Sequence, residues 1–257
     1  MRFSPRPGQG TVVLSVDVDD AVRGASLEAL VESFARRSVP ATFALAHAAG
    51  SPHFDRLLAG HPANEIALLV PSTWTCGGDR ARVAAELTTQ TAAAAAAGMR
   101  LSTLVAEAGA LDGHADLLLK HGVTAVRGGP SQASRSAWPR WLGGRAPQAA
   151  ANEPRAIRYG LWEFRPDVTL PAAGRGARRR IELASERGTT CQVAVDAAAM
   201  AAEGRSGAAA LDALLLAVDD RRAEGTLAVG TLADAARRLL RPRTLTAAQS
   251  ILRTRAA

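Results

Sequence analysis

Apolar and polar positions alternate along the chain with two periods, one typical of strands and one typical of helices. Residues 12–18 and 39–45 are short apolar runs rich in β-branched side chains, the pattern of strands buried on both faces. Between them, residues 23–37 carry apolar side chains at the spacing of one helix face, namely Leu27, Leu30, Val31 and Phe34. A helix between two such strands predicts a right-handed crossover and a parallel pair.

The same alternation continues to the end of the chain. Further strands are predicted at residues 65–70, 100–106, 123–127, 156–164, 189–195 and 226–229. Further helices are predicted at residues 54–58, 79–97, 112–121, 175–187, 207–224 and 232–240. A set of about seven or eight strands separated by helices favours an α/β barrel that is closed or nearly closed, with an open doubly wound sheet as the alternative.

The chain length fits one domain, since barrels of 257 residues commonly form a single unit. We assign residues 1–240 to this domain. Residues 128–155 form a long irregular segment rich in Gly, Pro, Ser, Ala and Arg, which is typical of a functional or poorly ordered loop. Residues 241–257 form an Arg-rich tail.

The net charge of +7 changes this picture little. Lys120 is the only lysine, so the basic residues reflect a preference for arginine. Arg178, Arg179, Arg180 and the tail arginines could contact phosphates. Aromatic residues make up only 4% of the chain, and no helix-turn-helix or zinc-finger spacing occurs, so nucleic-acid binding is not favoured.

Cysteine usage and hydropathy indicate the compartment. Cys76 and Cys191 form neither a CxxC pair nor a disulfide framework. Residues 1–8 lack the apolar segment of a secretory signal, and no apolar run of about 18 residues could span a bilayer. We therefore predict a cytoplasmic protein without a membrane span.

Candidate chemistry begins at the end of the first predicted strand, where Asp17, Asp19 and Asp20 lie together. Three carboxylates this close repel each other unless a metal, another cation or a raised pKa relieves them, and active sites often contain such clusters. The alternative is a solvated acidic loop, because Asp is also a common turn and N-cap residue.

Several segments in this order resemble the polysaccharide deacetylases, also called the NodB-homology family or carbohydrate esterase family 4. The resemblance spans nearly the whole chain, and the segments are VVLSVDVDD at 12–20, VPATF at 39–43, HPANEIA at 61–67, GVTAVRG at 122–128 and GTLAVGTLA at 225–233. It implies a distorted (β/α) barrel with seven strands that acts on the N-acetyl groups of sugars.

The resemblance also implies a divalent metal such as zinc, held by one carboxylate and two histidines. A second carboxylate would act as general base and a further histidine as general acid. The positions that match the two histidine ligands are Leu69 and Thr73. A leucine has no lone pair and a threonine hydroxyl is a weak neutral ligand, so neither replaces an imidazole.

Two further motifs depart from the family pattern. Where the family has an aromatic-Pro-Arg segment, residues 105–109 read VAEAG and include Glu107, so the arginine expected to orient the base is missing from that segment. Where the family has a His-Pro pair with the general acid, the chain has Asp196. An aspartate could protonate a leaving amine only if burial raised its pKa.

The remaining acids permit two assignments of base and ligand, either Asp17 with Asp19 or Asp19 with Asp20. Without imidazoles we predict no tightly bound zinc and no other cofactor, with weak Mg²⁺ or Ca²⁺ binding as the alternative. His47 and Trp74 are candidate substrate-binding residues because both follow predicted strands near the acids. Their alternatives are a solvated loop histidine and a packed indole.

The sequence thus supports three hypotheses. The leading one is a deacetylase-like pseudoenzyme that binds a glycan, a glycoconjugate or a partner protein in polysaccharide biosynthesis. The second is an active hydrolase with a rebuilt acidic site that uses Asp17, Asp19, Asp20, Glu107 and Asp196. The third is an arginine-driven nucleic-acid binder, which would show a steep dependence on salt.

Overall fold

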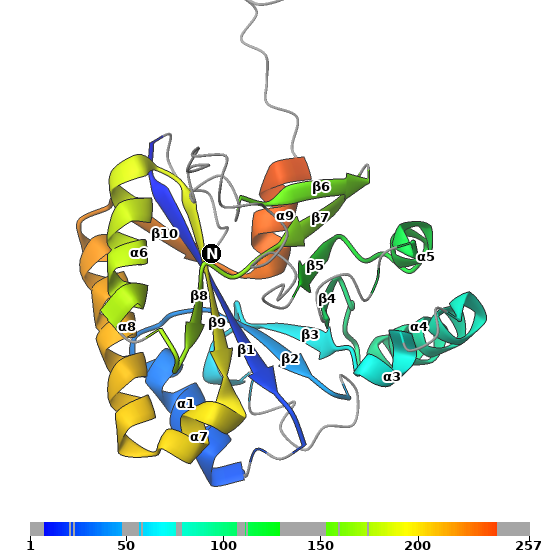
Figure 1. Ribbon diagram of the computed structural model, residues 1–257, viewed down its shortest axis with the longest axis horizontal. Helices are drawn as coiled ribbons and strands as arrows, with labels where there is room; N and C mark the ends of the chain where they lie inside the picture. The colour runs from blue at the N-terminus through cyan, green and yellow to red at the C-terminus, as the bar shows by residue number, and fades with distance from the viewer. Residues whose placement is uncertain are drawn as a thin grey trace, which may run out of the picture.

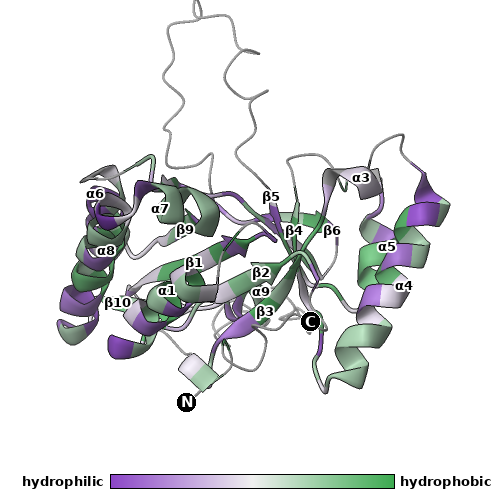
Figure 2. Ribbon diagram, turned by 90° about the horizontal axis from the view of Figure 1, so that it is seen from below, coloured by the Kyte–Doolittle hydropathy of each residue, from purple (hydrophilic) through white to green (hydrophobic). Residues whose placement is uncertain are grey.

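The computed structural model describes residues 8–20, 22, 24–47, 57, 59–75, 79–106, 111, 113–128, 153–158, 160–173 and 175–240. Within them, ten strands form one curved sheet. Figures 1 and 2 place helices α1, α6, α7 and α8 on one side of the strands and α3, α4 and α5 on the other. Most of the predicted loop at 128–155, the tail at 241–257 and most of the predicted helix at 54–58 lie outside the described residues.

The elements follow the predicted alternation. The strands are β1 Gly10–Val18, β2 Thr42–Leu45, β3 Glu65–Leu69, β4 Thr103–Ala106, β5 Ala125–Gly128, β6 Arg155–Arg158, β7 Leu161–Phe164, β8 Val168–Leu170, β9 Thr190–Asp196 and β10 Leu227–Gly230. The helices are α1 Gly24–Arg36, α3 Ser72–Thr75, α4 Arg80–Ala96, α5 Ala115–Lys120, α6 Arg175–Arg187, α7 Ala197–Glu203, α8 Arg205–Ala223 and α9 Leu232–Leu240. No helix among these residues is both long enough and apolar enough to cross a bilayer.

Strand β1 is the centre of the sheet. It pairs in parallel with β9 along most of its length, with β10 at its beginning and with β2 at its end. The sheet continues from β2 through β3, β4, β5 and β7, and all of these neighbours are parallel. This order brings the carboxyl ends of β1 to β5 to one rim, where we expected the candidate site.

The prediction of a single strand at residues 156–164 is wrong. The segment forms two antiparallel strands, β6 and β7, with Arg158 opposite Leu161. The chain reverses at Gly160, whose φ of +89° is easily reached only by glycine. The three-residue strand β8 and the helix α7 were not predicted, because both are too short to show a clear period.

Alternation along the strands gives the sheet an outer and an inner face. Val12, Leu14 and Val16 of β1 belong to the large apolar cluster beneath the outer helices. Val13 points the other way and packs inside the barrel with Phe164 of β7 and with Leu232, Ala235 and Ala236 of α9. Helix α9 therefore fills the barrel interior at the end where the strands begin.

A carboxylate holds the start of α9 in this position. Glu65 Oε2 accepts hydrogen bonds from the backbone N–H of Ala233 at 3.0 Å and from Thr42 Oγ1 at 2.8 Å. Thr42 Oγ1 in turn accepts the N–H of Leu232 at 2.9 Å, and Thr103 donates to Glu65 Oε1. A carboxylate beside free N–H groups at a helix start also interacts favourably with the helix dipole.

We expect Glu65→Ala to lower the free energy of unfolding by about 2–4 kcal/mol, because it removes the acceptor of several enclosed donors at once. Urea denaturation measures the change. The matched control is Glu203→Ala, at an exposed position at the end of α7. A loss no larger than that of the control would contradict the anchoring role of Glu65.

Stability should also depend on pH through this group. Burial raises the pKa of Glu65 above its ordinary value, although hydrogen bonds from Thr103, Ala233 and Thr42 oppose the shift. The folded state then holds this proton more tightly than the unfolded chain, so the stabilisation is fully present below the unfolded pKa and is lost as pH rises through the folded pKa. The unfolding free energy of the wild type minus that of Glu65→Gln should therefore fall as pH rises from the unfolded to the folded pKa of Glu65. A rise of this difference with pH would refute a raised pKa for Glu65.

Candidate functional site

The three acids do not form one cluster in the structure. Asp17 lies within β1 and is half-buried, and it shares the inward-facing side of the strand with Val13 and Ser15. Asp19 and Asp20 follow the end of the strand and are exposed. The rim thus has one carboxylate inside the barrel and two at its surface.

An arginine contacts the inner carboxylate. Arg127 of β5 forms a salt bridge with Asp17, and the exposed fractions of the two side chains are 3% and 29%. β1 and β5 are not neighbours in the sheet, so the ion pair spans the barrel interior. Arg127 Nε is buried and has no hydrogen-bond partner among the described residues.

The contact with Arg127 balances the negative charge of Asp17. Of the three ways to relieve a crowded carboxylate, Asp17 uses a cation from the chain itself. The segment after β4 lacks the arginine that the resemblance implies, and the arginine that contacts Asp17 comes from β5. The sequence predicted a strand at residues 123–127 and no site role for Arg127. The available signal was a single charge at the end of an otherwise apolar run.

The positions of the expected histidine ligands hold an aliphatic side chain and an exposed threonine. Leu69 is half-buried and packs against a small cluster inside the barrel, formed by Ala44, Ala67 and Val105. Ala44 lies opposite Asp17 in the pairing of β1 with β2. Thr73 lies in α3 and is exposed. The wall of the barrel next to Asp17 is therefore apolar along β2, β3 and β4.

Asp196 has a structural task. It ends β9, lies opposite Asp17 in the pairing of β1 with β9, and is exposed. Its Oδ1 accepts the backbone N–H of Ala199 at 2.9 Å and so caps helix α7. An aspartate acting as general acid would need burial, which this position does not provide. Glu107 lies outside the described residues.

The two candidate substrate-binding residues differ in exposure. His47 is exposed and follows β2, whose Leu45 pairs with Val18, so it lies on the same rim as the acids. Trp74 is only 5% exposed and belongs to the large apolar cluster. An indole that stacks on a sugar needs a free face, so the position of Trp74 favours packing.

The side chains present do not fit the metal site that the resemblance implies. Across the described parts of the chain, no three His, Cys, Asp or Glu residues are grouped so that they could hold a metal ion. The carboxylate inside the barrel is engaged by Arg127, and the two at the surface have no imidazole at positions 69 and 73 beside them. A zinc site of one carboxylate and two histidines cannot be assembled from these groups.

Comparison with solved structures defines the fold. No protein-family model and no curated protein sequence matches the chain. A Mycobacterium smegmatis protein assigned as a polysaccharide deacetylase is similar over 96% of this chain and 97% of its own, with a TM-score of 0.60 and 18% identity. A variant of the peptidoglycan deacetylase PdaC from Bacillus subtilis is similar over 91% of this chain and 94% of its own, with a TM-score of 0.51 and 13% identity.

A third similar structure is a mutant of a carbohydrate esterase family 4 pseudoenzyme with restored enzymatic activity. It covers 92% of this chain and 72% of its own length, with a TM-score of 0.50 and 13% identity. These likenesses confirm the predicted fold. The chain has the distorted (β/α) barrel of the polysaccharide deacetylases.

The Asp17–Arg127 pair predicts an asymmetric response to mutation. Asp17→Asn should cost about 2–4 kcal/mol of unfolding free energy, because it leaves a buried guanidinium unpaired. Arg127→Met should cost less, since Asp17 retains access to water. The double variant should recover part of the loss. Urea denaturation of the two single variants and the double variant measures these losses. The control is the exposed pair Arg80–Asp116, where Asp116→Asn should lower the unfolding free energy much less. Additive losses would refute the pairing.

The role of Asp196 can be separated from acid catalysis by two substitutions. Asn is also a good N-cap, so Asp196→Asn should leave stability nearly unchanged, whereas Asp196→Ala should cost about 1 kcal/mol. Thermal or urea unfolding measures both. Equal losses for Asn and Ala would show that the cap on α7 does not matter for stability.

Proposed function

We propose that this protein is a polysaccharide deacetylase-like pseudoenzyme that has lost metal-dependent N-deacetylation and needs no metal cofactor. The observation that carries the proposal is Leu69, which packs against an apolar cluster at a position where the resemblance implies a histidine ligand. Without lone pairs in that wall, a divalent ion would depend on exposed carboxylates alone, which bind such ions weakly.

The salt bridge supports the same proposal. A carboxylate that binds a metal or attacks through water must offer its oxygens to the ion or the water. Here one oxygen of Asp17 contacts Arg127, which is almost completely buried and has few other ways to satisfy its charge. The acid therefore has a structural reason to be present that does not require catalysis.

We further propose that the rim binds a glycan or glycoconjugate, either alone or together with a partner protein of polysaccharide biosynthesis. The similar structures named above include deacetylases of polysaccharide and peptidoglycan, and this fold is suited to a carbohydrate ligand. Exposed Asp20 and His47 supply hydrogen-bonding groups on the rim, which can recognise sugar hydroxyls without hydrolysis.

One observation favours the alternative, an active hydrolase with a rebuilt acidic site. Arg127 fixes the orientation of Asp17, as a general base would require. Such an enzyme would use Asp17 with Asp19, Asp20, Asp196 and Glu107. The apolar wall and the use of Asp196 as a helix cap favour the pseudoenzyme.

The test is an assay for acetate release from chitin oligosaccharides and N-acetylated peptidoglycan fragments, with protein incubated with Zn²⁺, Co²⁺ or Mn²⁺. We expect no release above that of Asp19→Ala, and substoichiometric metal by elemental analysis. Metal-stimulated release that is lost in Asp19→Ala would overturn the proposal and support the hydrolase.

A gain of metal binding checks the physical reason. Leu69→His combined with Thr73→His places two imidazoles near the acids. The Co²⁺ absorption spectrum should show a ligand-field band for this double variant and none for the wild type.

Glycan binding is measured separately, by calorimetry with the same oligosaccharides. The combined variant Asp20→Ala and His47→Ala should weaken binding about tenfold, because each substitution removes one hydrogen bond.

A further inference from the structure

A cavity lies on the outer face of the sheet, on the side of β5 opposite to Asp17. Its volume is about 130 Å³. Val126 and Gly128 line it, whereas Arg127 between them points to the opposite face and reaches Asp17. The cavity and the rim site are therefore on different sides of β5, and the inference drawn from the cavity does not rest on the proposed function.

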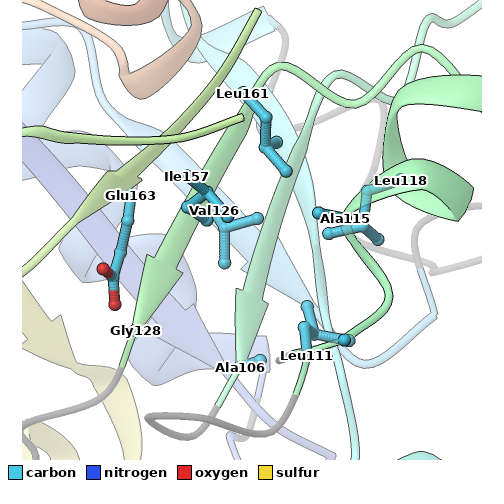
Figure 3. Close-up of a pocket in the computed structure, with 10 residues that line it drawn as sticks. Ala106, Leu111, Ala115, Leu118, Val126, Gly128, Ile157, Leu161 and Glu163 are labelled. Carbon is cyan, nitrogen blue, oxygen red and sulfur yellow. The ribbon is translucent and has the colours of Figure 1, made fainter. Parts of the chain in front are cut away.

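The cavity exists because small residues lie where α5 meets the sheet. The small lining residues are Ala106, Gly113, Ala115 and Gly128. Figure 3 shows Leu118 and Ala115 on one side of this space and the carboxylate of Glu163 on the other. A space of this size loses the contacts that close packing provides, and an apolar cavity of about 150 Å³ is large enough for a benzene ring.

Two arginines lie beside the acidic edge of the cavity. Among the described residues Glu163 is the one charged lining residue, and its carboxylate accepts hydrogen bonds from Arg155 Nε at 3.0 Å and from Arg165 Nε at 3.2 Å. Two guanidinium groups thus face one carboxylate. Their side chains are 64% and 39% exposed, so both can reach a ligand from the solvent side. Arg158 on the same hairpin is also exposed.

We propose that this cavity binds a small amphipathic anion, a compound with one aromatic ring or short branched alkyl group and one carboxylate. The apolar group fills the space between α5, β4, β5 and β7. The carboxylate pairs with the terminal nitrogens of Arg155 and Arg165 that Glu163 leaves unengaged, because Nε and Nη2 of each arginine already contact Glu163. A cation is disfavoured because Glu163, the acid that the described part of the chain places at the site, is already paired with two arginines.

The first experiment compares four probes by calorimetry and by amide chemical shifts. Benzoate has both the ring and the charge, toluene lacks the charge, acetate lacks the ring, and benzylamine reverses the charge. Benzoate should bind at least about tenfold more tightly than each of the others, the value of one charge-assisted hydrogen bond or one buried apolar group. No benzoate binding, or tighter binding of benzylamine, would overturn the proposal.

Variants locate the site. Ala115→Leu fills the cavity and should abolish benzoate binding, and the control Ala85→Leu on the exposed face of α4 should not. Arg155→Gln should weaken binding about tenfold through the loss of one charged contact. Ala106→Val provides a second filling variant in case Ala115→Leu does not fold. Full benzoate binding in the folded filling variants, or binding of an acidic peptide without binding of benzoate, would refute a small-molecule site here.

Discussion

The alternation of side chains along parallel strands is the constraint on which the rest of this structure depends. Every second residue of β1 to β5 points into a barrel, and each polar group placed there needs a partner, since water is largely excluded. Glu65 meets the requirement at one end with Thr42, Thr103 and the start of α9. Asp17 and Arg127 meet it at the other. Leu69, four residues after Glu65 on the same face of β3, adds apolar surface to this interior.

Local pattern was enough to predict most elements and not enough to predict the site. The helix at 175–187 agrees with α6 at both ends, because its apolar period and the glycine after it are both local signals. The hairpin of β6 and β7 was missed because Gly160 is a single interruption within an otherwise strand-like run. The Asp17–Arg127 contact joins residues 110 positions apart, so no local pattern could reveal it. The cap formed by Asp196 is local, and Asp before an alanine run could have indicated it.

The salt bridge also changes how an acidic motif at a strand end should be interpreted. Three carboxylates close in sequence suggested mutual repulsion, to be relieved by a metal, another cation or a raised pKa. In the structure one is paired with Arg127 inside the barrel and two reach solvent, which reduces the repulsion among them. A catalytic site and a buried structural ion pair therefore share the same sequence signature. What separates them is the chemistry of the facing strands, and here β2, β3 and β4 contribute Ala44, Ala67, Leu69 and Val105.

Strand β5 lies between the Asp17 end of the barrel interior and the outer cavity. The side chain of Arg127 points into the barrel interior, whereas Val126 and Gly128 line the outer cavity. Gly128 pairs with Ala106, which lines the same cavity, and Arg127 pairs with Val105, which lies in the apolar wall beside Leu69. A ligand that fills the cavity contacts the opposite face of the strand that orients the ion pair. Arg127 is buried and contacts Asp17, so the position of β5 sets where the guanidinium meets that carboxylate. The acidic rim and the outer cavity are thus joined by one short strand, although no residue belongs to both.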